Sequence, residues 1–396
     1  MSKNVKIANN LAINAKELME ELGLSDKKCV FITDKTIWNR NKSFFKTDYL
    51  ALFSHIKILD KPKADQAALA EVREVAQGCE FIICLGSGTI NDLCKFISSE
   101  KDIPYAVFTS AASMNGYLSK NASITINGHK KTLPAVTPIA VFCDLQILKA
   151  APHELTKAGI GDAMCFYSCW FDWYLSHKLL GTRFDARPFE MLKEKMAFFV
   201  KNYQKFSIHD DALLELLIEI LLISGEGMTL VGGSYPASQS EHLIAHTISM
   251  KYPKIAENTL HGAQIAVTSL TSTRIQKDVL KLAQAPILAA DVIFPQSKIV
   301  EFFGEEVSVE CENEFKGKLS EMQKAQGNSY VDDEWQAVKK ELEEVYCDDV
   351  ILSNIFAHFE INTSVESLGL TNSEYVECRD IAKFIRNRFT CLDLVF

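Results

Sequence analysis

Short apolar runs alternate with helical spacing over the first third of the chain. Five runs of mainly β-branched, aromatic and other apolar residues are each bounded by polar residues, which predicts five strands. These runs are residues 28–34, 55–59, 81–85, 105–109 and 139–142. Apolar positions at 11–22 and 64–77 recur with helical spacing, and Gly23 and Gly78 are natural helix ends. Strands that alternate with helices predict a parallel, doubly wound sheet.

Beyond Pro152 the pattern changes to almost continuous helical spacing. The expected helices cover residues 155–180, 188–205, 211–230, 238–250 and 262–285, a pair within 316–346, and 375–388. We therefore expect a Rossmann-like α/β domain at residues 1–152 and an all-α domain at residues 153–396. Before that boundary, the alternating residues 121–132 contain Asn127-Gly128, which predicts a β-hairpin.

The composition narrows the class of protein. Hydrophobic residues make up 47% of the chain and charged residues 23%, as in ordinary globular proteins. The net charge of −9 argues against a nucleic-acid surface. The most apolar run, 213–223, contains two glutamates and is too short to span a membrane. Eleven scattered cysteines, no Cys-x-x-Cys pair and no signal-peptide pattern favour reduced thiols and a cytoplasmic location.

The third predicted strand leads directly into a glycine turn, Gly86-Ser87-Gly88-Thr89-Ile90, and then into a helix. This order places backbone N–H groups and a helix N-terminus against a phosphate, and so favours a dinucleotide pyrophosphate. Position 91 is Asn, so the Gly-x-Gly-x-x-Gly pattern is incomplete and a plain tight turn is the alternative. Asp34, at the end of the first predicted strand, either accepts hydrogen bonds from an adenine ribose or caps the following helix.

Three of the seven histidines at residues 153–396 lie close together in sequence. Residues 237–246 predict a helix on which His242 and His246 are one turn apart, and His261 opens another helical segment. Two imidazoles and a carboxylate would make a three-ligand metal site, and Asp162 is the best candidate for the carboxylate. A histidine pair at this spacing is also common on ordinary helix surfaces, so the pattern leaves both interpretations open.

Three further features have two interpretations each. The small-residue loop 110–119 follows the fourth predicted strand, where it either contacts a nicotinamide ribose and brings Asn115 to a substrate or is a simple connection. Cys165 and Cys169 are either soft metal ligands or inert buried thiols. The cations Lys130, Lys131 and Arg388 either bind a substrate phosphate or are solvated charges.

Taken in order, five motifs resemble those of sn-glycerol-1-phosphate dehydrogenases, which belong to the superfamily of dehydroquinate synthase, glycerol dehydrogenase and iron-containing alcohol dehydrogenases. The motifs are Gly86-Ser87-Gly88-Thr89-Ile90-Asn91-Asp92-Leu93, Ala111-Ala112-Ser113-Met114-Asn115-Gly116-Tyr117, Ala158-Gly159-Ile160-Gly161-Asp162, Gly233-Ser234-Tyr235-Pro236-Ala237-Ser238-Gln239-Ser240-Glu241-His242 and His261-Gly262. The resemblance covers nearly the whole chain and implies a dehydroquinate synthase-like fold.

The resemblance also implies a role for each matched position. A divalent metal, zinc, nickel or iron, would be held by Asp162, His242 and His261, and His246 would face the substrate. Asn115 stands where the family has Asp, and it can hydrogen-bond a hydroxyl but cannot act as a base. The residues that would bind NAD(P) are Gly86, Ser87, Gly88, Thr89, Ile90, Ser110, Ala111, Ala112, Ser113 and Ser119.

The implied reaction is NAD(P)-dependent reduction of dihydroxyacetone phosphate to sn-glycerol 1-phosphate, by hydride transfer to a metal-polarised ketone. Asp162, Asn115 and His246 would take part in catalysis, and Asp34 would favour NAD over NADP by repelling a 2′-phosphate. The alternatives are a sugar-phosphate cyclase of the dehydroquinate synthase type, a dehydrogenase of another polyol or polyol phosphate, and a non-catalytic scaffold. A small phosphorylated substrate, a place in phospholipid metabolism and a homo-oligomer are expected with the leading interpretation.

Overall fold

The computed structural model describes residues 4–126, 129–288, 291–326 and 332–394. The chain forms two compact units. The first unit contains Met1–Gly159 and Lys205–Gly232, and the second contains Ile160–Gln204 and Gly233–Phe396.

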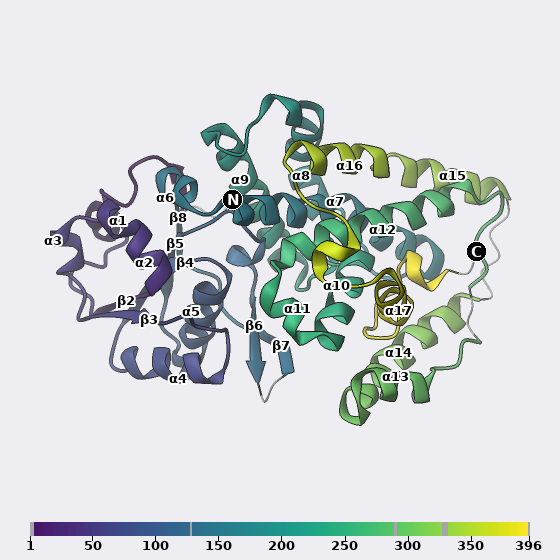
Figure 1. The fold of residues 1–396 in the computed structure, drawn as a ribbon, viewed down its shortest axis with the longest axis horizontal. Helices are drawn as coiled ribbons and strands as arrows, with labels where there is room; N and C mark the ends of the chain where they lie inside the picture. The colour runs from purple at the N-terminus through teal and green to yellow at the C-terminus, as the bar shows by residue number, and fades with distance from the viewer. Residues whose placement is uncertain (1–3, 127–128, 289–290, 327–331, 395–396) are drawn as a thin grey trace. The chain divides into compact units, whose positions relative to one another are not determined.

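Within the described residues, the first unit is built on a six-stranded parallel sheet, as the alternation of strands and helices predicted (Figure 1). Its strand order is β1 (Val5–Ala8), β8 (Ala140–Asp144), β5 (Tyr105–Thr109), β4 (Phe81–Gly86), β2 (Cys29–Asp34) and β3 (His55–Leu59). The five predicted strands are confirmed. β1 was not predicted, because a lysine interrupts its four residues and they form no apolar run; it pairs with β8 in the register Val5↔Val141.

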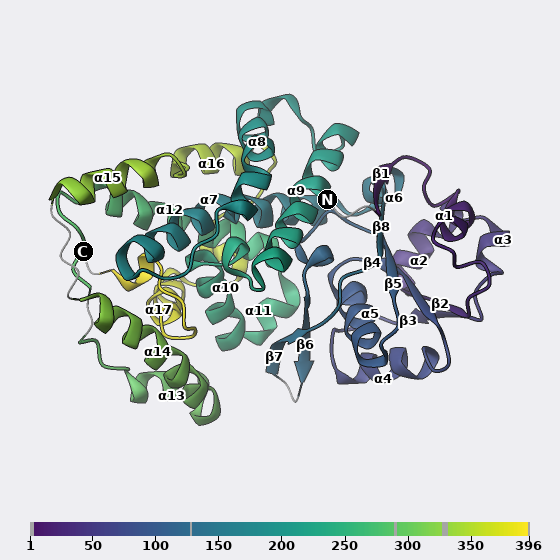
Figure 2. The same cartoon turned by 180° about the vertical axis from the view of Figure 1, so that it is seen from behind.

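Helices cover both faces of this sheet, which explains why the central strands are apolar without alternation. All six residues of β4 are buried. One face packs against α1 (Ala15–Glu21), α2 (Lys35–Asn41) and α3 (Thr47–Leu50) through Phe31, Phe81, Ile83, Leu85, Phe108 and Phe142. Figure 1 and Figure 2 show α4 (Gln66–Val75) and α5 (Gly88–Lys101) on the opposite face.

A hairpin and two helices also belong to the first unit. The predicted hairpin is formed by β6 (Asn121–Ile126) and β7 (His129–Pro134), while its expected turn, Asn127-Gly128, lies outside the described residues. The two helices are α6 (Leu145–Ala150) and α9 (Asp211–Val231).

The placement of α9 differs from the expected boundary after residue 152. This helix follows two segments of the helical half in sequence, but it packs on the first unit. Thr229 Oγ1 donates a hydrogen bond to the Leu118 carbonyl at 2.7 Å. At Gly225 a side chain would place its Cβ only 2.4 Å from the Asn115 carbonyl oxygen, so glycine permits the close approach. Helical spacing predicted the helix, but it carries no information about which unit the helix joins.

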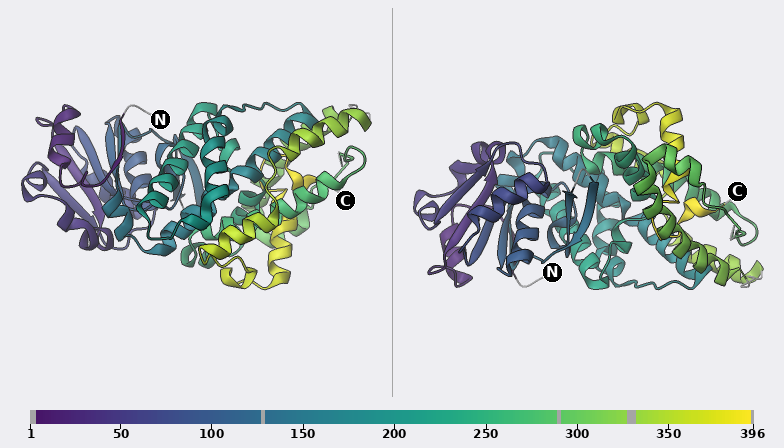
Figure 3. Two further views of the ribbon diagram at one scale, coloured as in Figure 1. Left: turned by 90° about the horizontal axis from the view of Figure 1, so that it is seen from above. Right: turned by 90° about the horizontal axis from the view of Figure 1, so that it is seen from below.

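The second unit is helical in all its described elements (Figure 3), as predicted. They comprise most of α7 (His153–Leu180), with α8 (Arg187–Asn202), α10 (Ser240–Lys251), α11 (Pro253–Asn258), α12 (His261–Lys281), α13 (Gln296–Phe303), α14 (Glu305–Ala325), α15 (Asp332–Glu343), α16 (Asp349–His358) and α17 (Asn372–Ala382). No helix in the described ranges is both long and apolar enough to cross a membrane.

Three helices in this unit were not expected, and two others begin or end at residues other than those expected. The helices α11, α13 and α16 were not predicted, and two of them begin at or directly after a proline, Pro253 and Pro295. The start of α14 lies at Glu305, well before residue 316, because Gly304 at φ +87° ends α13 and acidic residues suit the first turn of the next helix. The last helix, α17, ends at Ala382 and not at 388.

Asp172 on α7 joins three segments of the second unit. Its Oδ2 accepts from the Ser240 N–H at 3.2 Å, and its Oδ1 accepts from Gln276 Nε2 at 3.0 Å and from the Cys391 N–H at 3.2 Å. The side chain is fully buried. Burial raises the pKa of the Asp172 carboxyl to about 6, and the charge of Glu241 adds to the rise although the hydrogen bonds oppose it.

We predict that Asp172→Asn changes how stability depends on pH. The folded pKa lies above the unfolded value of about 3.9, so ionisation of Asp172 destabilises the folded protein. This destabilisation is absent below pH 4 and complete above pH 6. The free energy of unfolding of the wild type minus that of the variant should therefore fall by on the order of 3 kcal/mol between pH 4 and pH 7. Urea unfolding at several pH values measures this difference. Exposed Asp278→Asn is the matched control, and a difference for Asp172→Asn that does not change with pH would contradict the prediction.

Candidate active site

Asp162, His242 and His261 lie together in the second unit. Asp162 is on α7, His242 is in the first turn of α10 and His261 is the first residue of α12. The helices α7 and α12 approach very closely beside this cluster, because a Cβ on Gly161 would lie 2.1 Å from the carbonyl oxygen of Gly262. Glycine at position 161 thus allows two helices to bring their ligand-type side chains together.

One nitrogen or oxygen atom from each of these three residues lies within 4.8 Å of the other two. His242 Nε2 is 3.8 Å from Asp162 Oδ1, and the rings of His242 and His261 have centroids 5.1 Å apart. Asp162 and His242 are buried, whereas His261 is exposed. One carboxylate and two imidazoles suit zinc, nickel or ferrous iron, and three protein ligands leave a coordination position for a substrate. The donor set therefore fits the divalent metal that was expected here.

His246 belongs to the same cluster. Its ring centroid lies 5.7 Å from that of His242 and 6.1 Å from that of His261, and its ring is nearly parallel to the His261 ring. The residue is half-buried. The structure therefore brings together all four metal-site and substrate-facing residues expected in this unit.

Glu241 lies beside His242 and was not among the expected site residues. Its Oε1 lies 2.8 Å from His242 Nδ1 and accepts from the Gln239 N–H at 2.8 Å. Its Oε2 accepts from Ser168 Oγ at 2.7 Å. Burial alone would raise the pKa of the Glu241 carboxyl, but His242 and the Gln239 N–H lower it to about 2. A fully buried carboxylate is thus held ionised behind the candidate metal ligand.

Cys165 and Cys169 also approach Glu241, with one candidate ligand atom from each residue within 4.8 Å of the others. Both thiols are buried, and burial raises the pKa of the Cys169 thiol well above its usual range. Cys169 Sγ donates to Glu241 Oε1 at 3.1 Å. The carboxylate therefore has several donors already, which favours inert buried thiols over a second metal site.

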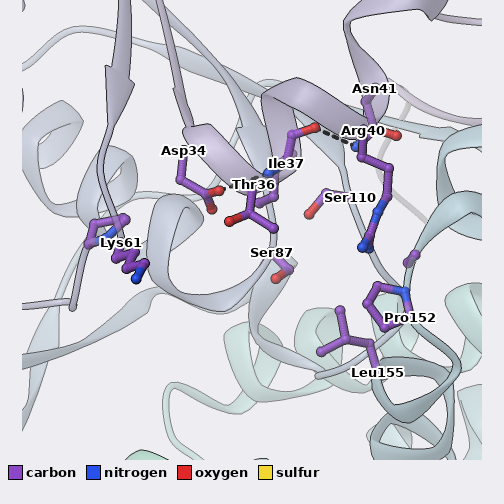
Figure 4. Close-up of a pocket in the computed structure, with 12 residues that line it drawn as sticks. Asp34, Thr36, Ile37, Arg40, Asn41, Lys61, Ser87, Ser110, Pro152 and Leu155 are labelled. Atoms are coloured by element: carbon purple, nitrogen blue, oxygen red, sulfur yellow. Dashed lines mark hydrogen bonds between the residues drawn. The ribbon is translucent and has the colours of Figure 1, made fainter.

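The first unit contains a pocket of about 260 Å³ at the carboxyl ends of its strands (Figure 4). Ser87 and Ser110 line it from the ends of β4 and β5, which pair in the register Gly86↔Thr109. Asp34 and Arg40 line it from the region of α2. The other lining residues are Thr36, Ile37, Asn41, Lys61, Pro62, Ala151, Pro152 and Leu155.

The glycine turn supplies the N-terminus of α5, which begins at Gly88. Ser87 precedes it and makes no side-chain cap hydrogen bond, while its side chain lines the pocket. Gly86 is needed because a Cβ there would lie 2.3 Å from Ile90 Cβ. Thr89 is half-buried and the Ile90 side chain is fully packed, so Ile90 can offer a ligand only its backbone. This geometry fits the expected pyrophosphate of a dinucleotide.

Asp34 does what the capping interpretation predicted and also lines the pocket. Its Oδ1 accepts from the Ile37 N–H at 2.8 Å, which caps α2. In Figure 4 the carboxylate lies between Thr36 and Lys61, and the Arg40 side chain extends toward Pro152 and Leu155. Arg40 and Lys61 were not expected here, because only the folded chain brings them to the end of β2.

The loop 110–119 is held in place by hydrogen bonds from Lys95, a fully buried residue of α5. Lys95 Nζ donates to the Gly116 carbonyl at 2.6 Å, to Ser119 Oγ at 3.2 Å and to the Asn121 carbonyl at 3.1 Å. The Ser119 side chain, expected to line the cofactor, is buried in these contacts. Asn115 is half-buried and precedes the 3₁₀ turn Gly116–Leu118.

Three other residues of this loop were expected to bind the cofactor. Ala111 and Ala112 are buried, and Ser113 is half-buried. The Ala112 carbonyl lies against α7, where a Cβ on Gly159 would come within 1.9 Å of it. The backbone of the loop is therefore held rigidly next to the strand end that lines the pocket.

Arg388 is half-buried and held by hydrogen bonds, so it is not a solvated charge. Its guanidinium donates to the Ser238 carbonyl and, at 3.2 Å, to Ser234 Oγ, and it lies 4.5 Å from the centre of the Tyr235 ring. Burial lowers the pKa of Arg388. These contacts stabilise the segment that leads into α10 and its histidines.

Comparison with known proteins identifies the family. Residues 6–152 match the family model for iron-containing alcohol dehydrogenases. A glycerol-1-phosphate dehydrogenase [NAD(P)+] from Thermococcus sibiricus is 28% identical over 312 residues, which cover 76% of this chain and 87% of the relative. The corresponding enzyme from Methanosarcina acetivorans is 31% identical over 248 residues, which cover 60% of this chain and 69% of the relative. The chain belongs to the glycerol-1-phosphate dehydrogenase family. Family membership confirms the resemblance expected from the five motifs.

A solved structure of low sequence identity shows the same fold. Maleylacetate reductase from Rhizobium sp. strain MTP-10005 superposes with a TM-score of 0.62 at 12% identity, covering 99% of this chain and 92% of the reductase. This likeness supports the fold class expected from the sequence, an α/β domain with a parallel sheet followed by a helical domain. Members of the glycerol-1-phosphate dehydrogenase family are oxidoreductases, which agrees with the enzyme class expected for this chain.

Proposed function

We propose that this protein catalyses the NAD(P)-dependent, metal-dependent reduction of dihydroxyacetone phosphate to sn-glycerol 1-phosphate. The observation that supports it best is the Asp162/His242/His261 cluster in a member of the glycerol-1-phosphate dehydrogenase family. The pocket at the ends of β4 and β5, beside the N-terminus of α5, supports the dinucleotide part of the proposal.

The chain contributes binding, orientation and proton transfer to this reaction. Asp162, His242 and His261 would hold one divalent ion, which when bound supplies Lewis-acid polarisation of the ketone oxygen. The three ligands leave the remaining coordination position for the substrate. His246 lies next to these ligands and carries an imidazole suited to donating the proton that completes the alcohol. Asn115 would hydrogen-bond a substrate hydroxyl without acting as a base.

NAD is the cofactor that Asp34 favours, because its carboxylate would accept hydrogen bonds from ribose hydroxyls and repel a 2′-phosphate. Arg40 and Lys61 line the same pocket and carry the opposite charge. NADP is therefore the weaker but accessible alternative in this proposal. The eleven cysteines are all free and buried, and a cytoplasmic location and a homo-oligomeric state stay predictions.

The test is an absorbance assay with purified protein, dihydroxyacetone phosphate and either NADH or NADPH. It is run before and after treatment with a chelator, and then with zinc, nickel or ferrous iron restored. We expect oxidation of the reductant that stops on chelation and returns with one of the metals, and faster turnover with NADH. No oxidation by metal-loaded protein that still binds NADH would overturn the assignment of this substrate.

A further inference from the structure

We propose that Glu241 is a positioning residue for the metal site, which holds His242 in the tautomer and orientation that present its Nε2 to the ion. The inference rests on the proposed function, since it assumes that Asp162, His242 and His261 bind a metal. Glu241 itself would not contact the ion.

The argument begins with hydrogen-bond geometry. A carboxylate can only accept, so the 2.8 Å contact between Glu241 Oε1 and His242 Nδ1 places the imidazole proton on Nδ1. Nε2 then carries the free lone pair, and it is the nitrogen that lies 3.8 Å from Asp162 Oδ1. The ring is therefore set with its lone pair on the side where Asp162 lies. Carboxylate–histidine–metal arrangements of this kind strengthen the histidine as a ligand.

The surroundings of Glu241 show how its own position is fixed. The side chain is fully buried, and the Gln239 N–H and Ser168 Oγ each donate to one of its oxygens, at 2.8 and 2.7 Å. Cys169 Sγ adds a further donor at 3.1 Å. Four donors on one carboxylate hold it rigidly, and a rigid acceptor is what fixes an imidazole.

A role limited to general stability makes a different prediction. In that case, removal of any of the four donors would weaken metal binding as much as removal of the carboxylate charge does. Glu241→Gln keeps the size of the side chain and removes its charge and one acceptor oxygen. Ser168→Ala is the matched control, because it removes a buried hydrogen bond to the same carboxylate on the oxygen that does not face His242.

The experiment measures zinc affinity of the metal-free full-length protein by competition with a chromophoric chelator, and in parallel the absorption spectrum of the cobalt-substituted protein. For Glu241→Gln we expect zinc binding weakened by about 10- to 100-fold, together with an altered cobalt spectrum. Ser168→Ala should keep both at wild-type values, even where thermal unfolding shows that both variants lose stability. Equal zinc affinity in Glu241→Gln and wild type, or equal weakening in both variants, would overturn the inference.

A second measurement needs no change at Glu241. In metal-free wild-type protein labelled with ¹⁵N-histidine, the His242 signals, assigned through their loss in His242→Asn, should show a protonated Nδ1 and an unprotonated Nε2. A protonated Nε2 would overturn the inference even if Glu241→Gln does not fold. Failure of the wild type to bind one zinc ion would instead remove the proposed metal site and the inference with it, whereas tight wild-type binding with the wrong tautomer would remove only the inference.

Discussion

His261→Ala should abolish turnover without unfolding the protein. The substitution removes one of three metal ligands, so the ion should be lost and the ketone oxygen left without its Lewis acid. Such polarisation contributes several kcal/mol to transition-state stabilisation, which corresponds to a loss of at least about 1000-fold in kcat/KM. The His261 side chain is exposed, so its truncation should change the free energy of unfolding by less than about 0.5 kcal/mol.

Metal content after dialysis, the rate of NADH oxidation and thermal unfolding check this prediction together. His55→Ala is the matched control, because His55 is an exposed histidine on β3, far along the chain from the ligand set. It should keep both metal and activity. If His261→Ala kept its metal and its turnover, a non-catalytic or differently liganded site would replace the proposed one.

The strands of the first unit were predictable because burial on both faces requires continuous apolar runs, and β2, β4, β5 and β8 consist of such runs. The edge strand β1 was not predictable, since it has little apolar sequence and forms a strand through its pairing with β8. Helical spacing likewise located α9 but could not assign it to the first unit. Local sequence determines an element well and its packing partner poorly.

The candidate metal ligands could be recognised from residue type and order, and the fold then brought them within reach of each other. Arg40 and Lys61 could not be recognised as pocket residues from the sequence. They lie six and 27 positions after Asp34, and only the fold brings them to one pocket. Glu241 is a different case. It directly precedes His242, and consecutive helix residues do not usually face each other, so the sequence gives no reason to pair them. Their contact arises at the first turn of α10, where the Gln239 N–H also meets the carboxylate.

Gly161→Ala should lower both the stability of the protein and its affinity for metal. The new Cβ would lie 2.1 Å from the Gly262 carbonyl oxygen and 3.1 Å from the Ala266 side chain, so α7 and α12 would have to separate. Backbone atoms cannot move aside as a flexible side chain can, and overpacking of this kind destabilises by about 1–3 kcal/mol. Because Asp162 follows Gly161 and His261 precedes Gly262, the separation would also widen the ligand set and weaken metal binding.

Urea unfolding and zinc competition measure the two effects. Gly317→Ala is the matched control within the same unit, since Gly317 is also inside a long helix but the three atoms nearest to its Cβ would all belong to the terminal amide of Asn387. That amide can rotate away, and alanine favours the helix, so the control should stay close to wild type in stability and in zinc affinity. Equal tolerance of alanine at both positions would mean that the contact between α7 and α12 does not set the spacing of Asp162 and His261. Strong destabilisation by Gly161→Ala with unchanged zinc affinity would separate the packing of these helices from the geometry of the ligands they carry.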